Sequence, residues 1–284
     1  WDFEGIYASS RHIPGVRFPG TIHPGLIGTL PSADLLKTWN DREKKLFDTN
    51  PTRTPPLCTL PDGMAGTTTA LMGGMTGADA KLAGEEAART VPGREHGGNC
   101  DIKNLSRGSK VFFPVYVDGA GLSMGDIHWS QGDGEITFCG AIEMAGWIDI
   151  SVDIIKGGME MYGVTNPIFQ TSPIDANYSE YLVFEGISVD EHDGEQHYLD
   201  ATVAYRRACL NAVEYLKKFG YSGEQAYMIL GTAPVEGRVA GIVDIPNACC
   251  TVSIPTAIFD FDINPNATGP TQSIPVGVDV AECT

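Results

Sequence analysis

The runs ITFCGAI (residues 136–142) and WIDISVDII (residues 147–155) consist mainly of β-branched, aromatic and other apolar side chains. β-Branched and aromatic residues are enriched in strands, so both runs predict β-strands. Similar composition predicts two further strands, over 110–117 and 181–189, and short β-type runs alternate between residues 239 and 262. The sequence therefore predicts a fold in which sheets dominate.

Four helices are predicted around these strands. Their ranges are 33–47, 78–90, 198–219 and about 222–230. The longest has apolar residues at three- and four-residue spacing, which is the period of an amphipathic helix. Ser32 and Ser222 are typical N-cap residues, and Gly220 is a typical C-terminal stop. We expect these helices to flank the sheets.

Two stretches predict neither long helices nor long strands. Residues 1–31 are punctuated by glycine and proline, which predicts an extended, packed connector. The stretch from 49 to 77 is rich in proline, threonine and glycine, which predicts a surface segment. No linker divides the chain, so we expect one unit of the α+β class over 1–284.

The composition excludes several classes of partner. Nineteen basic residues stand against 36 acidic ones, which gives a formal net charge of −17. Such a charge repels phosphate backbones and anionic lipids, so we expect neither nucleic acid nor a membrane as a partner. No run approaches the roughly 18 apolar residues of a membrane span. The chain shows no signal peptide and its seven cysteines lack a CxxC pair, so we expect a cytoplasmic protein with reduced thiols.

The densest set of ligand-type side chains lies in MGDIHWSQGDGEITFCGAIE, residues 124–143. Its members are Asp126, His128, Gln131, Asp133, Glu135 and Glu143. Strand residues two apart share a face, so an extended segment puts Asp126 beside His128 and Asp133 beside Glu135. A turn at residues 130–132 would bring the two pairs together. One imidazole with several carboxylates suits a divalent cation such as Zn²⁺. The same pattern fits an ordinary Gly-Asp-Gly turn with solvated acids.

A second loop, HGGNCD at 96–101, again places an imidazole, an amide and a carboxylate beside glycines. Other motifs are weaker evidence for a catalytic or binding site. The string GLSMG resembles the nucleophile elbow G-x-S-x-G, but no helix is predicted after its Ser123. The adjacent Cys249 and Cys250 are expected in the core. The remaining histidines are isolated in the sequence: His12, His23, His192 and His197.

Three long strings resemble the acetamidase/formamidase family, and most closely its formamidases. They are HIPGVRFPGTIHPGLIG (12–28), the segment from REHGGNCD to IEMAG (94–146) and APVEGRVAGIVDIPNACCT (233–251). The resemblance covers nearly the whole chain. It implies a β-rich fold with sandwich-like or barrel-like sheets and a few flanking helices. It also implies hydrolysis of a short aliphatic amide, formamide first, by a homo-oligomer without an organic cofactor, with a divalent metal in some relatives.

The resemblance also selects residues. The family motif HGGNxD falls on His96, Asn99 and Asp101 with the two glycines between them. The motif GDxHxxQGDGE falls on the 125–135 segment, and the glutamate of AIEM is Glu143. Family members have a further segment upstream of the equivalent of Trp1. We therefore expect the chain to lack an N-terminal part, either because it is a processed or partial product or because another chain in the particle supplies the rest.

These observations predict a metal-assisted hydrolase. The expected metal is zinc, with calcium as the other option, and its expected ligands are Asp101, His128 and Asp133. Asp126 is expected to orient the site or to serve as a further ligand. Glu135 or Glu143 is expected to act as general base and later to protonate the departing ammonia. The expected substrate-binding residues are Asn99, Gln131 and His96.

The sequence leaves other readings open. The substrate is acetamide or a lactam in one of them, and hydrolysis proceeds through a covalent intermediate on Ser123 or a cysteine. In another, the chain is a non-catalytic acidic scaffold whose carboxylates hold Ca²⁺. In a third, it is an inactive fragment that still folds.

Overall fold

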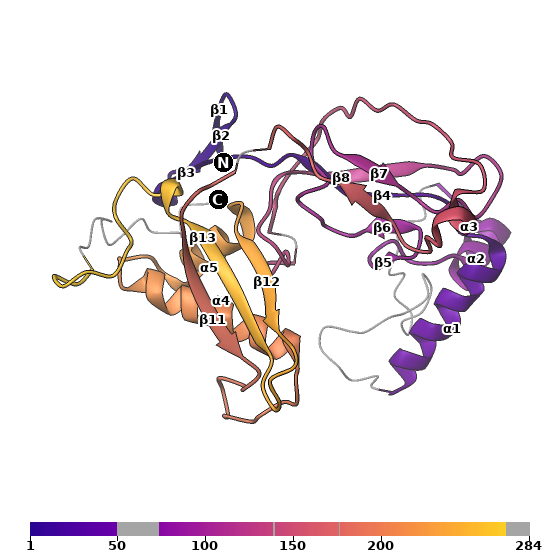
Figure 1. Cartoon of the computed structure of the whole chain (residues 1–284). Helices are drawn as coiled ribbons and strands as arrows, with labels where there is room; N and C mark the ends of the chain where they lie inside the picture. The colour runs from indigo at the N-terminus through magenta and orange to yellow at the C-terminus, as the bar shows by residue number, and fades with distance from the viewer. Residues whose placement is uncertain (50–73, 139, 176, 271–284) are drawn as a thin grey trace.

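The structure is a computed structural model that describes residues 1–49, 74–138, 140–175 and 177–270. Most of the stretch from 49 to 77, expected at the surface, lies outside these residues. The described chain is a mixed α/β structure made mostly of sheets with a few helices, as the sequence predicts. Figure 1 shows two groups of elements, one around β11–β13 and the other around β4 and β8.

The helices flank the sheets. They are α1 (Ala33–Thr49), α2 (Gly77–Glu86), α3 (Gly158–Tyr162), α4 (Ala201–Lys217) and α5 (Gly223–Thr232), with a 3-10 turn η1 (Thr256–Ile258). The strands are β1 (Asp2–Glu4), β2 (Tyr7–Ser10), β3 (Ile13–Pro19), β4 (His23–Gly28), β5 (Gly93–Arg94), β6 (Gly97–Asn99), β7 (Lys110–Phe112), β8 (Ser123–Ser130), β9 (Ile142–Met144), β10 (Ile168–Gln170), β11 (Tyr181–Ile187), β12 (Glu236–Gly241) and β13 (Cys249–Pro255).

Every strand pair in the described sheets is antiparallel. The largest sheet has the order β5-β6-β4-β8-β9, and a second has the order β11-β13-β12. Two smaller sheets have the orders β1-β2-β3 and β10-β7. The five-stranded sheet joins segments that are far apart in the sequence, because β4 pairs with both β6 and β8.

The main core lies between α4, α5 and the β11-β13-β12 sheet. Gly186 of β11 permits helix α4 to pack closely against the sheet, since a Cβ atom there would lie 2.2 Å from the backbone oxygen of Ala204 on α4. Leu216 of α4 and Ile254 of β13 are fully buried in this core. Burial of such a side chain contributes roughly 1.5–3 kcal/mol to the free energy of unfolding. The position of β13 and its neighbours is therefore held by apolar packing.

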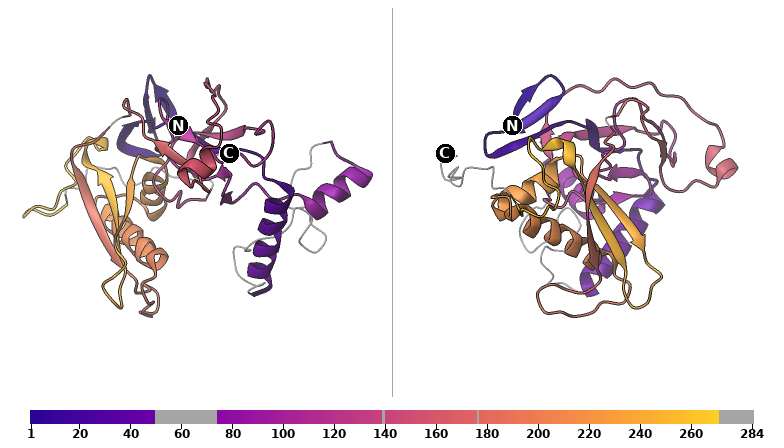
Figure 2. Two further views of the ribbon diagram at one scale, coloured as in Figure 1. Left: turned by 45° about the vertical axis from the view of Figure 1, so that its right-hand side comes forward. Right: turned by 60° about the vertical axis from the view of Figure 1, so that its left-hand side comes forward.

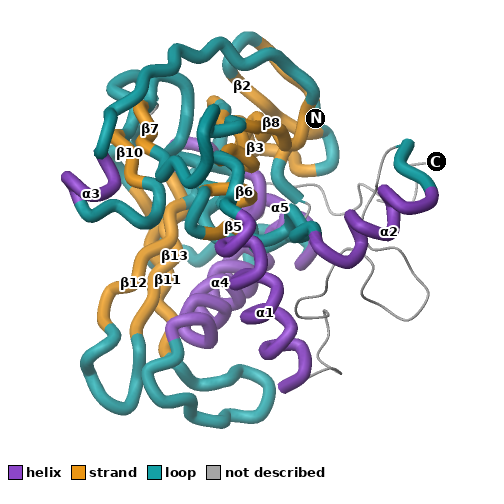
Figure 3. Tube along the Cα trace, turned by 90° about the vertical axis from the view of Figure 1, so that its right-hand side faces the viewer, coloured by secondary structure: helices purple, strands orange, loops and turns teal. Residues whose placement is uncertain are grey.

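Helix capping follows the sequence closely. Ser32 Oγ accepts a hydrogen bond from the Leu35 backbone N–H, and α1 covers the range predicted for it. Ser222 and Gln225 form a capping box at α5. The helix predicted over 198–219 is confirmed as α4, which begins three residues later and ends two residues earlier. Asp200 is its N-cap and accepts from two backbone N–H groups. α1 lies beside β5 (Figure 3), where Trp39 Nε1 donates to Glu95.

Several strand predictions are wrong. The first 31 residues form four strands and not a connector, with β4 in the middle of the largest sheet. The strand at 110 ends at Phe112, shortly before Pro114, which has no N–H for a ladder. Residues 136–138 form turns, and strand geometry begins only at Ile142. The run 147–155 has no regular structure and is almost entirely exposed.

The C-terminal predictions hold in part. The run CTVSI lies in β13, whereas GIVDI forms most of the β12–β13 connection and IFDFDI has no strand beyond an isolated bridge at Phe259. The strand predicted over 181–189 is confirmed as β11. The Ala-rich helix α2 ends at Glu86, four residues before the predicted end, and projects away from the sheets with α1 (Figure 2).

Candidate functional site

Three polar residues form a row across the largest sheet. In the strand register His23 of β4 lies opposite His128 of β8, and His128 lies opposite Glu143 of β9. Asp126 precedes His128 by two residues on the same strand, and its Oδ1 lies 3.2 Å from His128 Nε2. The prediction that these two side chains share a face is confirmed.

Two loops add further carboxylates to this row. Asp101 follows β6, and Glu135 follows the turn after β8. His128 belongs to two groups whose ligand atoms all lie within 4.8 Å of one another, one with Asp101 and Glu135 and one with Asp126 and Glu143. The structure thus brings together one imidazole and four of the carboxylates that the sequence selects.

Gly25 of β4 makes room for this cluster. A Cβ atom at this position would lie 2.6 Å from Asp126 Oδ2, 2.8 Å from Asp101 Oδ1 and 2.9 Å from His128 Cε1. The Gly25 carbonyl also accepts the backbone N–H groups of Cys100 and Asp101, each at 3.1 Å. Because any side chain would occupy the space of the site, glycine both anchors the Asp101 loop and leaves the cluster open.

The backbone at three of the carboxylates is in the left-handed region. The φ angles are +49° at Asp101, +55° at Asp126 and +39° at Glu135. L-residues other than glycine adopt this region rarely, at a cost of about 1–3 kcal/mol each. Such strain concentrates at functional sites, where surrounding structure holds side chains in one arrangement. The clustering of three strained acids marks this site as more than solvated surface.

The electrostatics of the cluster favour a bound proton or cation. Burial is the main cause that raises the pKa of Glu135, to about 8, and the neighbouring Asp101, Asp126 and Glu143 raise it further. Burial also raises the pKa of Asp101, and Asp126 acts in the same direction. Several carboxylates in one partly buried place cannot all be ionised without compensation. At neutral pH Glu135 therefore holds a proton unless a positive charge is present.

Two buried polar atoms in the cluster have no hydrogen-bond partner. They are His128 Nε2 and Asp101 Oδ1. The Asp101 carboxylate shares a hydrogen bond with Glu135 while Glu135 is protonated, so its oxygen is unpaired only when both carboxyls are ionised. Asp126 lies close to His128 Nε2 but off the direction in which a ring N–H would donate. Buried polar atoms are nearly always paired, so each unpaired atom requires an explanation. An imidazole nitrogen and carboxylate oxygens within 4.8 Å of one another fit a divalent cation of the zinc type.

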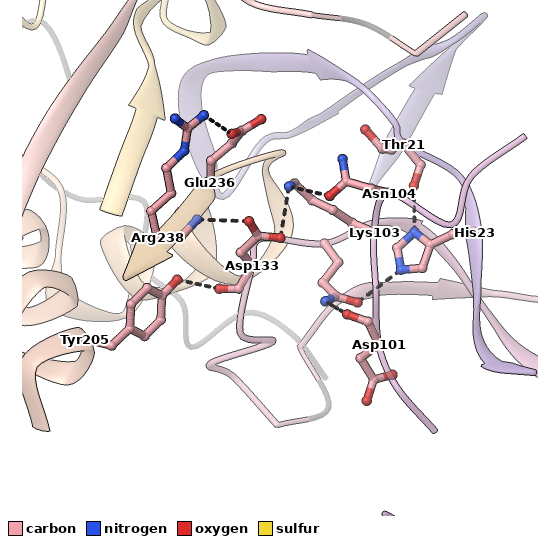
Figure 4. A network of polar contacts seen from close by, with 11 residues as sticks. Thr21, His23, Asp101, Lys103, Asn104, Asp133, Tyr205, Glu236 and Arg238 are labelled. Carbon is pink, nitrogen blue, oxygen red and sulfur yellow. Dashed lines mark hydrogen bonds and ion pairs between the residues drawn. The ribbon is translucent and has the colours of Figure 1, made fainter. Parts of the chain in front are cut away.

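A buried hydrogen-bond network supports His128. Gln131, fully buried, lies with its Oε1 2.9 Å from His128 Nδ1 and 3.0 Å from His23 Nε2. Its Nε2 donates to the backbone oxygen of Asp101 at 2.5 Å. His23 Nδ1 lies 2.7 Å from the Thr21 backbone oxygen (Figure 4). Burial is the main cause that lowers the pKa of His23.

The structure gives Gln131 a different place from the one predicted. Its amide is engaged with the protein on both its oxygen and its nitrogen and is closed to solvent. It therefore orients the site and does not face a substrate. His23 and Gly25 were missed because each is unremarkable in the sequence. The signal that links His23 to the site is its strand register with His128, which local sequence does not reveal.

Asp133 also lies apart from the cluster. Its carboxylate pairs with Lys103 Nζ at 2.9 Å and accepts the Gly237 backbone N–H at 2.9 Å. Tyr205 donates to its backbone oxygen (Figure 4). The Lys103 side chain is only 4% exposed. Asp133 and Glu135 do not share a strand face, because the chain turns between them, and Asp133 is not included in the candidate metal group.

Of the other residues considered in the sequence analysis, one lies beside the cluster and the rest do not. Asn99 lies at the edge of the cluster, where its Nδ2 donates to Asp101 Oδ2 at 3.2 Å. His96 instead packs on Trp39 of α1, with ring centroids 4.6 Å apart. Ser123 is exposed and begins strand β8, so the strand-to-helix turn of a nucleophile elbow is absent there. Cys250 is buried as expected, and Cys249 is partly exposed.

A cavity of about 180 Å³ lies near Lys103, Tyr178 and Glu236. None of the clustered carboxylates lines it, and neither does His128. We place the candidate site at His128, because left-handed backbone angles and raised carboxyl pKa values coincide there with unpaired buried atoms, whereas the cavity has an unpaired buried atom, the Tyr178 hydroxyl, without the other two features.

Comparisons with known proteins show the family to which the chain belongs. Residues 1–261 match the model of the Acetamidase/Formamidase family. The chain is 64% identical over 281 residues to a formamidase of Methylophilus methylotrophus, which covers 99% of this chain and 68% of that protein. It is 60% identical over 242 residues to an acetamidase of Mycolicibacterium smegmatis, which covers 84% of this chain and 58% of that protein. Among solved structures, γ-lactamase from Delftia acidovorans matches with a TM-score of 0.92 and 66% identity, over 98% of this chain and 67% of that one.

These matches define an amidohydrolase that acts on small amides. Within that class, the chain belongs to the acetamidase/formamidase family. It spans between 58% and 68% of the length of the curated relatives described above. No helix in the described ranges is long and apolar enough to cross a membrane.

Proposed function

We propose that the His128 cluster hydrolyses a short linear amide, with formamide preferred, to the carboxylate and ammonia with the help of a bound divalent cation. The observation that carries this proposal is the fully buried His128 Nε2, which has no hydrogen-bond partner and lies within a group of Asp, His and Glu side chains. The formamidase relative at 64% identity supports the choice of formamide.

His128 and Asp101 are the proposed ligands, with Asp126 as a third. The imidazole nitrogen favours zinc over calcium, because calcium prefers oxygen ligands alone. When bound, such a cation supplies Lewis acidity and lowers the pKa of water toward neutrality. The ligand role of Asp126 is supported by its Oδ1, which lies 3.2 Å from His128 Nε2.

Glu135 is the proposed acid–base group. Its Oε1 lies 3.9 Å from His128 Nε2, and its pKa is raised to about 8. A carboxyl with a pKa near neutrality can take a proton from the attacking water and return it to the leaving amide nitrogen. Positive charge beside Glu135 lowers its pKa and makes the basic form available at neutral pH. Glu143 belongs to the other group around His128, with Asp126, and is the second candidate for this role.

Asn99 is the proposed contact for the amide group of the substrate. Its side-chain nitrogen is held by Asp101 and by the Val91 carbonyl, which keeps the side chain in place at the edge of the cluster. A fixed amide offers a preorganised polar contact for a small substrate. Replacement of Asn99 with Ala is expected to raise KM more than it lowers kcat.

A cyclic amide is the second candidate substrate. The observation that favours it is the TM-score of 0.92 with a protein described as a γ-lactamase. The deciding experiment measures ammonia release from formamide and acetamide, and ring opening of a γ-lactam, by zinc-loaded protein. Highest kcat/KM for formamide supports the proposal. Ring opening with no ammonia release from either linear amide contradicts it.

We propose that the protein works as a homo-oligomer in a reducing, cytoplasmic compartment. Large exposed apolar side chains support association, with Trp147 98% exposed and Phe138 73% exposed. Apolar patches of this kind often mark interfaces. The four cysteines in the described ranges that are assigned a state are free thiols, which fits reducing conditions. Analytical ultracentrifugation tests the assembly, and Trp147→Ser is expected to weaken it if the 147–155 segment is the contact.

A further inference from the structure

The side chain of Gln131 joins the two buried histidines of the sheet to the Asp101 loop. It is fully buried and makes three contacts, to His128 Nδ1, to His23 Nε2 and to the Asp101 backbone oxygen. A buried amide engaged on all these sides has one orientation. The Asp101 oxygen can only accept a hydrogen bond, so the atom that faces it at 2.5 Å is the amide nitrogen.

This orientation determines which ring nitrogen of His128 carries a proton. The amide oxygen of Gln131 is an acceptor, and it lies 2.9 Å from His128 Nδ1. Only an N–H at Nδ1 forms a hydrogen bond there, because a lone pair would face another lone pair. In the neutral ring the proton on Nδ1 leaves Nε2 with a free lone pair. Nε2 is the atom that faces the carboxylates and has no hydrogen-bond partner.

We propose that Gln131 and His23 are positioning residues that hold His128 in its Nδ1–H tautomer and direct Nε2 into the carboxylate cluster. Ligating histidines commonly donate their second ring N–H to an oxygen acceptor, which fixes both tautomer and ring orientation. Here the acceptor is a side-chain amide whose own orientation is set by the loop that supplies Asp101 (Figure 4).

His23 contributes by locking Gln131 from the other side. Its Nε2 lies 3.0 Å from Gln131 Oε1, and its Nδ1 lies 2.7 Å from the Thr21 backbone oxygen. Both oxygens are acceptors, so the neutral His23 ring donates to one of them at a time. The His23 ring also meets the His128 ring edge to face, with centroids 5.1 Å apart and an interplanar angle of 82°. Because both its nitrogens face protein oxygens and it is 1% exposed, His23 supports the site and does not contact a substrate.

The tautomer is a property of the protein without a cation, whereas its effect on cation binding rests on the proposed function. The test therefore begins with metal-free, ¹⁵N-histidine-labelled protein and a long-range ¹H–¹⁵N NMR experiment that distinguishes protonated from unprotonated ring nitrogens. Wild-type His128 is expected to show a protonated Nδ1 and an unprotonated Nε2. A predominant Nε2–H form would overturn the proposal, whatever the protein binds.

Three variants separate positioning from general stability. Gln131→Leu keeps the volume but removes the acceptor, so His128 is expected to show a mixture of tautomers. His23→Phe removes the contact to Gln131 and is expected to produce a smaller change in the same direction. His23→Gln restores a donor toward Gln131 and is expected to return the wild-type tautomer. Ser188→Ala is the matched control, because it removes the buried hydrogen bond that the Ala248 backbone N–H donates to Ser188 Oγ, elsewhere in the fold.

Zinc affinity measured by competition with a chromogenic chelator gives the second readout. Gln131→Leu and His23→Phe are expected to lose roughly 10- to 100-fold in affinity, which is the usual effect of removing such a partner. His23→Gln and Ser188→Ala are expected to stay close to wild type. Wild-type spectra in the Nδ1–H form without any zinc binding would support the positioning role and refute the proposed cation. Unchanged His128 tautomer in Gln131→Leu, or equal affinity losses in Ser188→Ala, would overturn the positioning role.

Discussion

Replacement of Gly25 with Ala tests whether the site needs the space beside β4. The new Cβ atom would lie 2.6 Å from Asp126 Oδ2 and 2.8 Å from Asp101 Oδ1, where an ordinary contact begins at 3.4 Å. The carboxylate oxygens must therefore move by 0.8 Å (3.4 − 2.6) and 0.6 Å (3.4 − 2.8). Metal-ligand distances tolerate only about 0.2 Å. The φ angle of Gly25 is not in the left-handed region, so the effect of the substitution comes from the added methyl group alone.

The matched control is Gly125→Ala on the neighbouring strand β8. A Cβ atom there meets nothing within 4 Å, and Gly125 lies beside Leu26 in the same sheet. Gly25→Ala is expected to lower kcat/KM for formamide by about 100-fold, the typical effect of a misplacement near 1 Å. Overpacking is expected to lower its unfolding free energy by about 1–3 kcal/mol. Gly125→Ala is expected to match wild type in both measurements.

The assays are zinc competition titration, ammonia release from formamide and thermal unfolding followed by circular dichroism. The reasoning would be refuted if the zinc affinity and the kcat/KM of Gly25→Ala lay within about threefold of those of Gly125→Ala. A threefold change is less than 1.4 kcal/mol, which corresponds to a tenfold change in affinity. Loss of activity in both variants would show that the sheet, and not the space at Gly25, is sensitive.

Two further predictions concern charge. In metal-free protein Glu135 has a pKa of about 8 against an ordinary 4.5, so its contribution to stability is present below pH 4.5 and is lost as the pH rises through about 8. The Glu135→Gln side chain cannot ionise, so this variant is expected to become more stable than wild type as the pH rises through this window, and to lose amidase activity. Thermal melts at a series of pH values measure the stability. A difference in melting temperature that is the same at all pH values would contradict the raised pKa of Glu135. Lys103→Met removes one partner of a largely buried ion pair, and the unfolding free energy is expected to fall by about 3 kcal/mol in urea denaturation. Its zinc affinity is expected to be unchanged, and a large loss of affinity would place the Lys103–Asp133 pair in the metal site.

Local signals in the sequence predicted what local chemistry controls. The Ser32 and Ser222 N-caps and the long helix α4 could be placed because capping and helical periodicity depend on neighbouring residues. Asp126 and His128 could be placed on one face because strand alternation has a period of two. These residues form one side of the candidate site.

Long-range pairing could not be predicted in the same way. The 147–155 run has strand-like composition but no partner strand, and β propensity mainly reflects packing against neighbours. The glycine and proline residues of β4 concealed a central strand, because Gly25 serves a close approach and not a turn. His23 reaches His128 only through sheet register, which single-sequence patterns do not encode, whereas the turn that brings Glu135 to His128 was expected from the local glycines.

The account depends most on a cation held by His128 and required for amide hydrolysis. The direct measurement is a zinc titration of chelator-treated protein, with metal content and ammonia release from formamide followed in the same samples, for wild type and His128→Ala. Wild-type activity is expected to rise with bound zinc and to level off at one ion per site, while His128→Ala neither binds zinc nor releases ammonia. Full activity in chelator-treated wild type, or in metal-free His128→Ala, would contradict the account.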